Sequence, residues 1–477
     1  MRIRLLGQSV PASIVVRAAL EIVLLFLVLY AAAVLRWRLD IATIERLEGA
    51  LWPRALLFSI VMFACQLALG LHSARQRAPT EGILVRIVAA VGVGVVVSGA
   101  CFYLVPDMWI GRGVVVLAGV GAGIIALILH IASARLIDER VFKGRVLVYG
   151  AGRAAEAILG LRRRADRRGF TVVGFVRPPG DGFDLVSAPA PSPEAFASQP
   201  LFESNGRLIE LCERFDVDEI VVAVDDRRRN FPIRELLECR FAGVDVTELL
   251  TFLERESGRV RIDVLNPSWI IFGEGFRRGS LRQLTSRVLD LIAGTVLLVA
   301  AVPLVIAAVI AIKVEDGLAA PVLYRQERVG FGGRIFRLMK FRSMRVDAEA
   351  PGEARWAQRN DPRVTRVGAV IRRLRVDELP QILNVLRGDM SLVGPRPERP
   401  EFVEELAEKI PYYVERHCIK PGITGWAQLC YPYGSSEQDA IEKLQYDLYY
   451  IKNNSLLLDL VILVQTAEVA LFGKGAR

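Results

Sequence analysis

Residues 359–401 read RNDPRVTRVGAVIRRLRVDELPQILNVLRGDMSLVGPRPERPE and combine two adjacent carboxylates, Asp377 and Glu378, with many arginines. Pro380 follows the carboxylates, and a Gly-Pro-Arg-Pro turn lies at Gly394–Pro397. Arginine binds phosphate through paired hydrogen bonds, and Mg²⁺ combines carboxylates with phosphate oxygens. The stretch therefore suits a site that holds a strong anion, such as a diphosphate, beside a nucleophile and a metal ion. The alternative is a solvated helix face with ordinary Glu–Arg pairs. The arginines that precede the carboxylates are Arg363, Arg366, Arg372, Arg373 and Arg375.

The composition indicates membrane segments joined to charged globular parts. The chain has 477 residues, enough for two or three domains, and it is 52% hydrophobic although 24% of its residues are charged. The net charge of +9 fits an anionic partner, which can be a membrane surface, a phosphate-bearing substrate or nucleic acid. Nucleic acid is disfavoured, because zinc-finger spacing, RNA-binding aromatic patterns and a long basic tail are all missing from the sequence.

The cysteines and histidines carry no signal of a metal site or a disulfide framework. Six cysteines are scattered singly, without a Cys-x-x-Cys pair, which is typical of buried thiols in a reducing compartment. His417 lies beside Cys418, but the chain has only three histidines and none at ligand spacing from another.

Residues 1–143 contain four apolar runs, each near the length of about twenty residues that a spanning helix needs. Because three further runs follow the first, we expect a retained anchor rather than a cleaved signal peptide. Arginines precede the first run, separate the second from the third and follow the fourth, so the positive-inside rule places both ends of the predicted four-helix bundle in the cytoplasm. The runs are Val16–Leu35, Leu51–Leu71, Ile83–Val105 and Gly113–Ala134.

Residues 144–275 alternate between strand-like and helix-like segments, which predicts an α/β Rossmann-like domain with a parallel sheet. Arg145–Tyr149 is a short apolar strand, and the glycine turn that follows it, Gly150–Ala155, has the context of a phosphate-binding helix start. The third fingerprint position is alanine, and the next strand, Thr171–Val176, ends before arginine rather than before an acidic residue that would bind a ribose. A structural or regulatory module is therefore favoured over a nucleotide-binding one.

Residues 289–312 are long and apolar enough to span a membrane, yet arginines and lysines flank both ends. A straight span would place one basic flank, and the carboxylate site, on the wrong side. Pro303 near the middle removes a helical hydrogen bond, so we predict a re-entrant helix–break–helix in the inner leaflet. Near the C-terminus, Leu456–Phe472 is interrupted by acidic residues, which favours an interfacial helix.

Four motifs follow one another in the last part of the chain: KFRSM at 340–344, DELPQ at 377–381, GDMSLVGPRP at 388–397 and PGITGWAQ at 421–428. Together they closely resemble the catalytic domain of the bacterial polyprenyl-phosphate glycosyl-1-phosphate transferases. The resemblance covers the chain from about Leu281 to Arg477. The preceding four spans and Rossmann-like module look like the long form of this family, and GITGWAQLCYPYG at 422–434 looks most like its exopolysaccharide-initiating branch.

The resemblance implies a membrane protein whose residues 276–477 form a mainly α, monotopic catalytic domain. Asp377 would attack the β-phosphorus of a UDP-sugar, releasing UMP and leaving a phosphosugar on the carboxylate, and undecaprenyl phosphate would then accept the phosphosugar. Asp377 and Glu378 would hold Mg²⁺. The family usually has serine before the breaking proline, where this chain has Val302, and this weakens the case for a sharp break. The implied substrate-binding residues are Lys340, Arg342, Arg372, Arg396 and Asp447.

The resemblance also implies partners and a location. UDP-sugar, undecaprenyl phosphate and inner-leaflet lipids are the expected partners, a homodimer is possible, and the predicted location is the bacterial inner membrane with the catalytic domain on the cytoplasmic face. Two other functions compete with this one. A membrane-bound nucleotide-sugar dehydratase or epimerase needs a Tyr-x-x-x-Lys pair, which the chain lacks, and a non-catalytic scaffold is disfavoured because Asp377 and Glu378 are both intact. The sequence leaves the transferred sugar undetermined.

Overall fold

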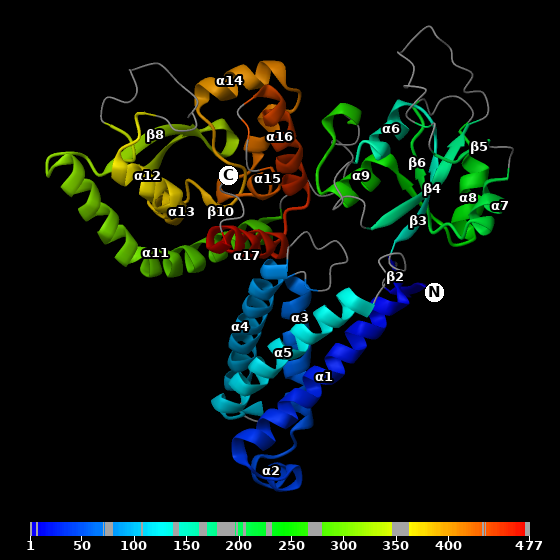
Figure 1. Cartoon of the computed structure of the whole chain (residues 1–477), viewed down its shortest axis with the longest axis horizontal. Helices are drawn as coiled ribbons and strands as arrows, with labels where there is room; N and C mark the ends of the chain where they lie inside the picture. The colour runs from blue at the N-terminus through cyan, green and yellow to red at the C-terminus, as the bar shows by residue number, and fades with distance from the viewer. Residues whose placement is uncertain are drawn as a thin grey trace. The chain divides into compact units, whose positions relative to one another are not determined.

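The computed structural model describes residues 2–5, 8–69, 71, 80–105, 108–136, 143–161, 169–178, 196, 199–203, 207–225, 231–265, 279–345, 362–431, 434 and 436–472. The chain divides into two compact units, Met1–Ser257 and Gly258–Arg477 (Figure 1). The first unit contains a helical bundle and a parallel sheet, and the second contains the residues of the candidate site.

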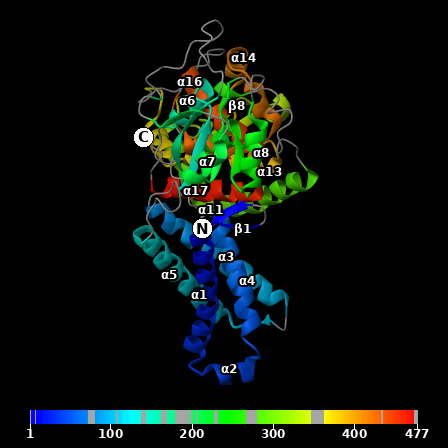
Figure 2. The same ribbon diagram turned by 90° about the vertical axis from the view of Figure 1, so that its right-hand side faces the viewer.

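The four predicted N-terminal apolar runs all form helices. After the short hairpin of β1 (Arg2–Leu5) and β2 (Gln8–Pro11), the helices are α1 (Ala12–Trp37), α2 (Ile41–Glu48), α3 (Trp52–Ala68), α4 (Thr80–Leu104) and α5 (Arg112–Leu136). Figure 2 shows α1, α3 and α4 running alongside one another. Side chains such as Leu25, Phe58 and Ala118 are fully buried between the helices, while the outer faces expose large apolar residues, as lipid-facing helices do.

By length and composition, three bundle segments and one later helix in the described part can each cross a membrane: Arg17–Trp37, Ile83–Leu104, Arg112–Ala132 and Ser280–Asp316. The run predicted at Leu51–Leu71 forms α3, a 17-residue helix that meets α2 at an angle of 95°. The pair α2 and α3 counts as one further span if the bent pair crosses together. Residues 72–79 contain Arg75 and Arg77, two of the arginines that set the predicted orientation, and they lie outside the described residues.

The predicted parallel sheet is confirmed in the second half of the first unit. Its strands are β3 (Gly144–Tyr149), β4 (Phe170–Arg177), β5 (Leu201–Glu203), β6 (Glu219–Val222) and β7 (Asp245–Glu248), and every pairing is parallel. The order β5-β4-β3-β6-β7 places the first strand centrally, as in doubly wound nucleotide-binding sheets. Helix α6 packs with α9 and α7 packs with α8, so the two pairs cover the two faces (Figure 1). The helices are α6 (Arg153–Leu159), α7 (Leu208–Arg214), α8 (Ile233–Phe241) and α9 (Leu249–Ser257).

The second unit is mainly helical, with two small pairs of strands. Strands β8 (Leu323–Val329) and β9 (Ile335–Phe341) form an antiparallel hairpin around η5 (Phe331–Gly333), and β10 (Ser391–Val393) pairs in parallel with β11 (Gly422–Thr424). Val385, Met390 and Leu444 lie in the centre of its hydrophobic core. The other elements are η4 (Ile262–Val264), α11 (Ser280–Asp316), α12 (Arg366–Arg373), η6 (Val376–Glu378), α13 (Gln381–Arg387), α14 (Pro400–Lys409), η7 (Tyr413–Cys418), α15 (Trp426–Cys430), α16 (Glu437–Lys452) and α17 (Leu456–Phe472).

Helix α11 corrects the predicted helix–break–helix. It runs as one helix of 37 residues through Pro303, and Figure 1 shows it as a single bowed ribbon. Proline removes one backbone donor, and the hydrogen bonds on either side of it maintain the helix. The prediction invoked a break to bring both basic flanks to one side. In the structure, both ends of the unbroken α11 are bonded to the same core.

The first turns of α11 are fixed by three polar residues. Arg282 donates to Asp459 of α17 at 2.5 Å and to Asn454, while Arg287 donates to the carbonyl oxygens of Val385 and Leu386. The buried carboxylate of Asp290 accepts from the Ser391 hydroxyl and from Leu392 N, at 2.9 and 2.8 Å. The acidic residue that interrupts the last apolar stretch, Asp459, thus serves as an internal partner of α11.

The last turn of α11 is fixed to the same unit. Glu315 accepts from Arg366 N and Val367 N at 2.8 and 3.0 Å, so its carboxylate caps the start of α12. Asp316 forms an ion pair with Arg342, which follows β9. A helix of this length extends about 54 Å, and both of its ends contact one globular core.

Candidate active site

The two adjacent carboxylates lie on η6, a single turn between α12 and α13. Arg375, just before it, has a left-handed backbone with φ 58°, a conformation that is costly for a residue with a Cβ and that redirects the chain. Val376 packs with Ile312 of α11 and Phe341 of β9 in a small hydrophobic cluster. The backbone of the carboxylate pair is therefore held by α11, α12 and the β8–β9 hairpin.

Glu378 is surrounded by three cationic side chains. Its Oε1 lies 3.1 Å from Arg396 Nη2, 3.5 Å from Arg375 Nη1 and 3.6 Å from Lys340 Nζ. Burial alone would raise the pKa of Glu378, but Arg396, Lys340 and Arg375 outweigh it and lower the pKa to about 2. Glu378 is therefore ionised at every physiological pH.

Asp377 differs from its neighbour. The residue is 9% exposed, and its Oδ1 is buried without a hydrogen-bond partner in the described part of the chain. Burial, and then the charge of Glu378, raise the pKa of Asp377, while Lys340, Arg372 and Arg375 oppose the shift. A more basic carboxylate oxygen with an open lone pair is a better nucleophile than one already paired with cations.

The site has an excess of positive charge. Two carboxylates face four cationic groups, and burial lowers the pKa of one of them, Lys340, to about 8, although Glu378 opposes the shift. A dianionic group such as a diphosphate would offset that excess and complete the hydrogen bonding of the guanidinium groups. The four groups are Lys340, Arg372, Arg375 and Arg396.

The structure thus brings five of the seven predicted site residues together: Lys340, Arg372, Asp377, Glu378 and Arg396. It places the other two in separate pairs. Arg342 pairs with Asp316 at the end of α11, and Asp447 of α16 accepts from Arg416 Nη2 at 2.9 Å. Burial raises the pKa of Asp447 to about 6, with Arg416 opposing the shift. Nothing in these contacts directs Arg342 or Asp447 at the carboxylate pair.

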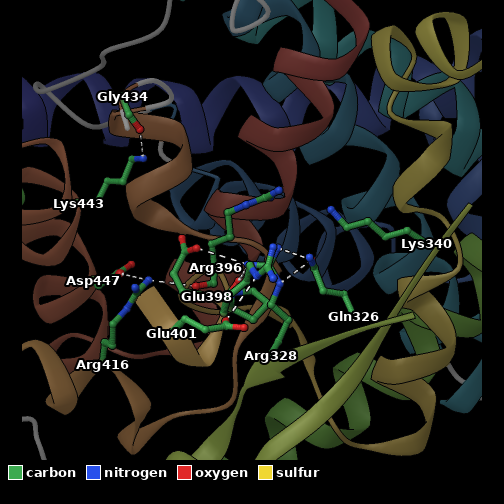
Figure 3. Close-up of polar contacts among 12 residues, drawn as sticks. Gln326, Arg328, Lys340, Arg396, Glu398, Glu401, Arg416, Gly434, Lys443 and Asp447 are labelled. Atoms are coloured by element: carbon green, nitrogen blue, oxygen red, sulfur yellow. Dashed lines mark hydrogen bonds and ion pairs between the residues drawn. The ribbon is translucent and has the colours of Figure 1, made fainter. Parts of the chain in front are cut away.

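Sequence reasoning missed a polar network behind the Gly-Pro-Arg-Pro turn, drawn in Figure 3. Arg416 donates to the main-chain carbonyl of Arg396 at 3.0 Å, and Arg328 donates to that of Pro397 at 3.0 Å. The prolines of this segment are the feature of the sequence that could have indicated these donors. Three prolines at 395, 397 and 400 lack N–H groups, so this segment depends on its carbonyls for much of its hydrogen bonding.

The donor set can be compared with what Mg²⁺ requires. Among the described residues, no group of three or more His, Cys, Asp or Glu side chains could enclose a metal ion. Magnesium, however, is commonly held by one or two carboxylates together with water and substrate phosphates. The adjacent carboxylates of Asp377 and Glu378 fit that pattern.

At the Gly150–Ala155 turn of the first unit, a side chain of the protein itself occupies the position predicted for a phosphate. Asp225, which follows β6, accepts from Arg153 N and Ala154 N at 3.0 and 2.8 Å. These are the N–H groups that a phosphate would use at the start of α6. A Cβ on Gly152 would lie 1.9 Å from Asp225 Oδ2, so the glycine is needed for the approach of the chain's own carboxylate.

Comparison with known proteins identifies a family for most of the second unit. The family model described as "Bacterial sugar transferase" matches residues 281–473. The chain is 32% identical over 438 residues to a UDP-glucose:undecaprenyl-phosphate glucose-1-phosphate transferase of Xanthomonas campestris pv. campestris, covering 81% of this chain and 87% of that protein.

Two other relatives are more similar to this chain over shorter stretches. A UDP-N-acetylgalactosamine-undecaprenyl-phosphate N-acetylgalactosaminephosphotransferase of Aeromonas hydrophila is 43% identical over 244 residues, covering 51% of this chain and 56% of that protein. An undecaprenyl-phosphate glucose phosphotransferase of Komagataeibacter xylinus is 44% identical over 199 residues, covering 41% and 37%. The chain therefore spans about half or less of the length of these two relatives.

Proposed function

The chain belongs to the bacterial sugar transferase family, and we propose that it transfers a sugar-1-phosphate from a UDP-sugar to undecaprenyl phosphate and releases UMP. The predicted family and the predicted class of enzyme, a phosphoglycosyl transferase, are confirmed by the relatives' similarity. The observation that carries the proposed reaction is the pairing of a cation-bound Glu378 with an Asp377 whose Oδ1 has no partner in the described structure.

The first step forms a bond between an Asp377 oxygen and the β-phosphorus of the UDP-sugar. The bond from that phosphorus to the oxygen bridging the two phosphates breaks, and UMP leaves with its electron pair. Arg396, Arg372 and Lys340 bind the phosphate oxygens and stabilise the charge that develops on them. Mg²⁺, when bound by Asp377 and Glu378, would supply further positive charge at those oxygens.

The second step reverses the roles at Asp377. An oxygen of undecaprenyl phosphate attacks the same phosphorus, the bond to Asp377 breaks, and the product is an undecaprenyl diphosphate sugar. Burial of the site limits competition from water for the phosphosugar. The relatives that resemble this chain are named for glucose, galactose and N-acetylgalactosamine. The UDP derivatives of these three sugars are therefore the first donors to test.

The experiment is a donor panel with purified full-length protein, undecaprenyl phosphate and Mg²⁺. Continued UMP release over many turnovers should require the lipid acceptor and one of the three UDP-sugars. A stoichiometric burst of UMP without acceptor, together with a labelled phosphosugar on Asp377, would support the covalent step. Product formation without any adduct at Asp377 under trapping conditions would contradict it.

We further propose that the second unit is monotopic, with the catalytic site at the cytoplasmic face of the bacterial inner membrane. Both ends of α11 are bonded to one core, so both lie on the same side of any bilayer. Its exposed apolar side chains, including Ile292 and Val299, would lie in the inner leaflet. A reporter fused after Lys313 should read as cytoplasmic, and a periplasmic reading would contradict this topology.

We propose a structural role for the Rossmann-like module, since Asp225 already uses the N–H groups at its glycine turn. The expected partners of the whole chain remain a UDP-sugar, undecaprenyl phosphate and inner-leaflet lipids, with a homodimer possible.

A further inference from the structure

The Gly394–Pro397 turn is held by Gly394 N, which donates to the Thr424 carbonyl at 2.9 Å, and by its own carbonyl oxygens. Pro395 and Pro397 have no N–H to donate. The carbonyl of Pro395 accepts from Gly422 N at 2.9 Å, and that of Arg396 accepts from Arg416 Nη2 at 3.0 Å. The main-chain position of Arg396, and with it the reach of its guanidinium to Glu378, therefore depends on a second arginine.

Arg416 is itself fixed by two buried partners. Its Nη2 also donates to Asp447 Oδ2 at 2.9 Å, and its Nη1 donates to the Tyr413 hydroxyl at 2.7 Å. The side chains of Arg416 and Asp447 are only 7% and 3% exposed. A charge pair this deeply buried destabilises the folded state unless its geometry and hydrogen bonding are complete. Removing one member leaves the other as an uncompensated buried charge. Figure 3 shows Asp447 and Arg416 on the far side of Arg396 from Lys340.

We propose that Arg416 and Asp447 are positioning residues for Arg396: they hold the main chain of the Gly394–Pro397 turn, and neither touches the substrate. The proposal rests on the proposed function and deepens it, because it assigns Asp447 an indirect role in place of the predicted substrate contact. Three side chains act in series. Asp447 orients Arg416, Arg416 holds the Arg396 carbonyl, and the Arg396 side chain meets Glu378 and the diphosphate.

A double-mutant cycle separates an indirect role from a direct one. Arg416→Lys keeps the charge but cannot serve the Arg396 carbonyl, Asp447 and Tyr413 together, since an ammonium lacks the planar fork. Measured on the full-length protein as the Kd for UDP with Mg²⁺, we expect Arg416→Lys to weaken binding about tenfold and Arg396→Ala about a hundredfold.

If Arg416 acts only through Arg396, the double variant should bind UDP as the Arg396→Ala variant does, within about twofold. Independent losses that multiply in the double variant would mean that Arg416 meets the ligand directly, and would overturn the proposal. Asp447→Asn, which keeps the side-chain shape and one acceptor oxygen, should follow the same pattern. Arg334→Lys, an exposed change in the β8–β9 hairpin, is the matched control and should leave binding unchanged.

A second readout needs no ligand and no turnover. Hydrogen exchange of the peptide covering residues 391–402 should be faster in both Arg416→Lys and Asp447→Asn, while strands β3 and β4 of the first unit exchange as in the wild type. Unchanged exchange in the turn would overturn the positioning role even if the wild type transferred no sugar. Conversely, faster exchange together with a wild type that neither binds UDP nor releases UMP would refute the proposed function and leave the positioning of Arg396 standing.

Discussion

Two turns of this chain carry sequence signals for phosphate binding, and the structure distinguishes them. At the Gly150–Ala155 turn, the backbone donors of Arg153 and Ala154 bind the carboxylate of Asp225 from the same module. At the Gly394–Pro397 turn, Arg396 joins Lys340 and Arg375 around Glu378, and the neighbouring Asp377 keeps an unpaired oxygen.

The difference lies in how the charges are balanced. In the first turn an internal anion already satisfies the donors, so a phosphate would have to displace it. In the second turn, four cations face two carboxylates. Because the site is buried, the attraction of the cations for a further anion is stronger than it would be in water. A glycine turn before a helix therefore indicates an anion site without saying whether the anion is a ligand or the chain itself.

The largest expected effect belongs to the nucleophile. Asp377→Asn should reduce UMP release by a factor on the order of 10³ or more, because an amide cannot form the covalent intermediate. The measurement is UMP release with the preferred UDP-sugar and undecaprenyl phosphate. Asp245→Asn makes the same chemical change at an exposed position in β7 of the first unit and should retain wild-type activity. Full activity of Asp377→Asn would remove the open carboxylate from the chemistry and with it the contrast between the turns.

Glu378→Gln should have the next largest effect. The change removes the charge that organises Arg396, Arg375 and Lys340, and also a proposed Mg²⁺ ligand. We expect kcat/KM for the UDP-sugar to fall about a hundredfold and the Mg²⁺ concentration for half-maximal activity to rise. An unchanged Mg²⁺ dependence would argue against Glu378 as a ligand.

The pH dependence should follow Lys340. Its pKa in the free protein is lowered to about 8, chiefly by burial, so the ammonium is charged below that pH and loses its proton above it. We expect kcat/KM to fall about tenfold per unit above pH 8, since kcat/KM reports groups of the free enzyme. Lys340→Arg should shift this limb to higher pH because arginine stays protonated. A wild-type profile flat to pH 9.5 would show that the charge of Lys340 is not needed.

The smallest expected effect tests the occupied turn. Asp225→Ala removes a carboxylate that accepts two backbone N–H groups, a change comparable to losing a helix cap worth about 1 kcal/mol. Amide exchange in the peptide containing Arg153 and Ala154 should speed up about fivefold, with UMP release unchanged. If the variant instead gained tight nucleotide binding, the module would be a masked site rather than a structural one.

Several features could be predicted because they depend on local sequence. Apolar runs of spanning length became helices α1, α3, α4 and α5, and short β-branched segments separated by helices became a parallel sheet. Asp377 and Glu378 were singled out by the arginine-rich sequence around them, whereas Lys340, Arg372 and Arg396 were implied by the resemblance to the transferase family. The break at Pro303 was predicted wrongly, since a charge argument about the flanks cannot distinguish a broken helix from an intact one held at both ends.

What the sequence determined alone was the kind of chain this is: membrane helices, a parallel-sheet module and an arginine-rich carboxylate site, each set by composition and spacing within a few tens of residues. Only the tertiary structure decided which charges meet. Asp225 and the glycine turn are more than 70 residues apart, and Arg342 pairs with Asp316 rather than with the site. Ion pairs form between side chains that the fold brings within a few ångströms, and burial then determines which charged groups can still bind a ligand. The order of the residues in the sequence specifies neither the pairs nor the groups left to bind a ligand.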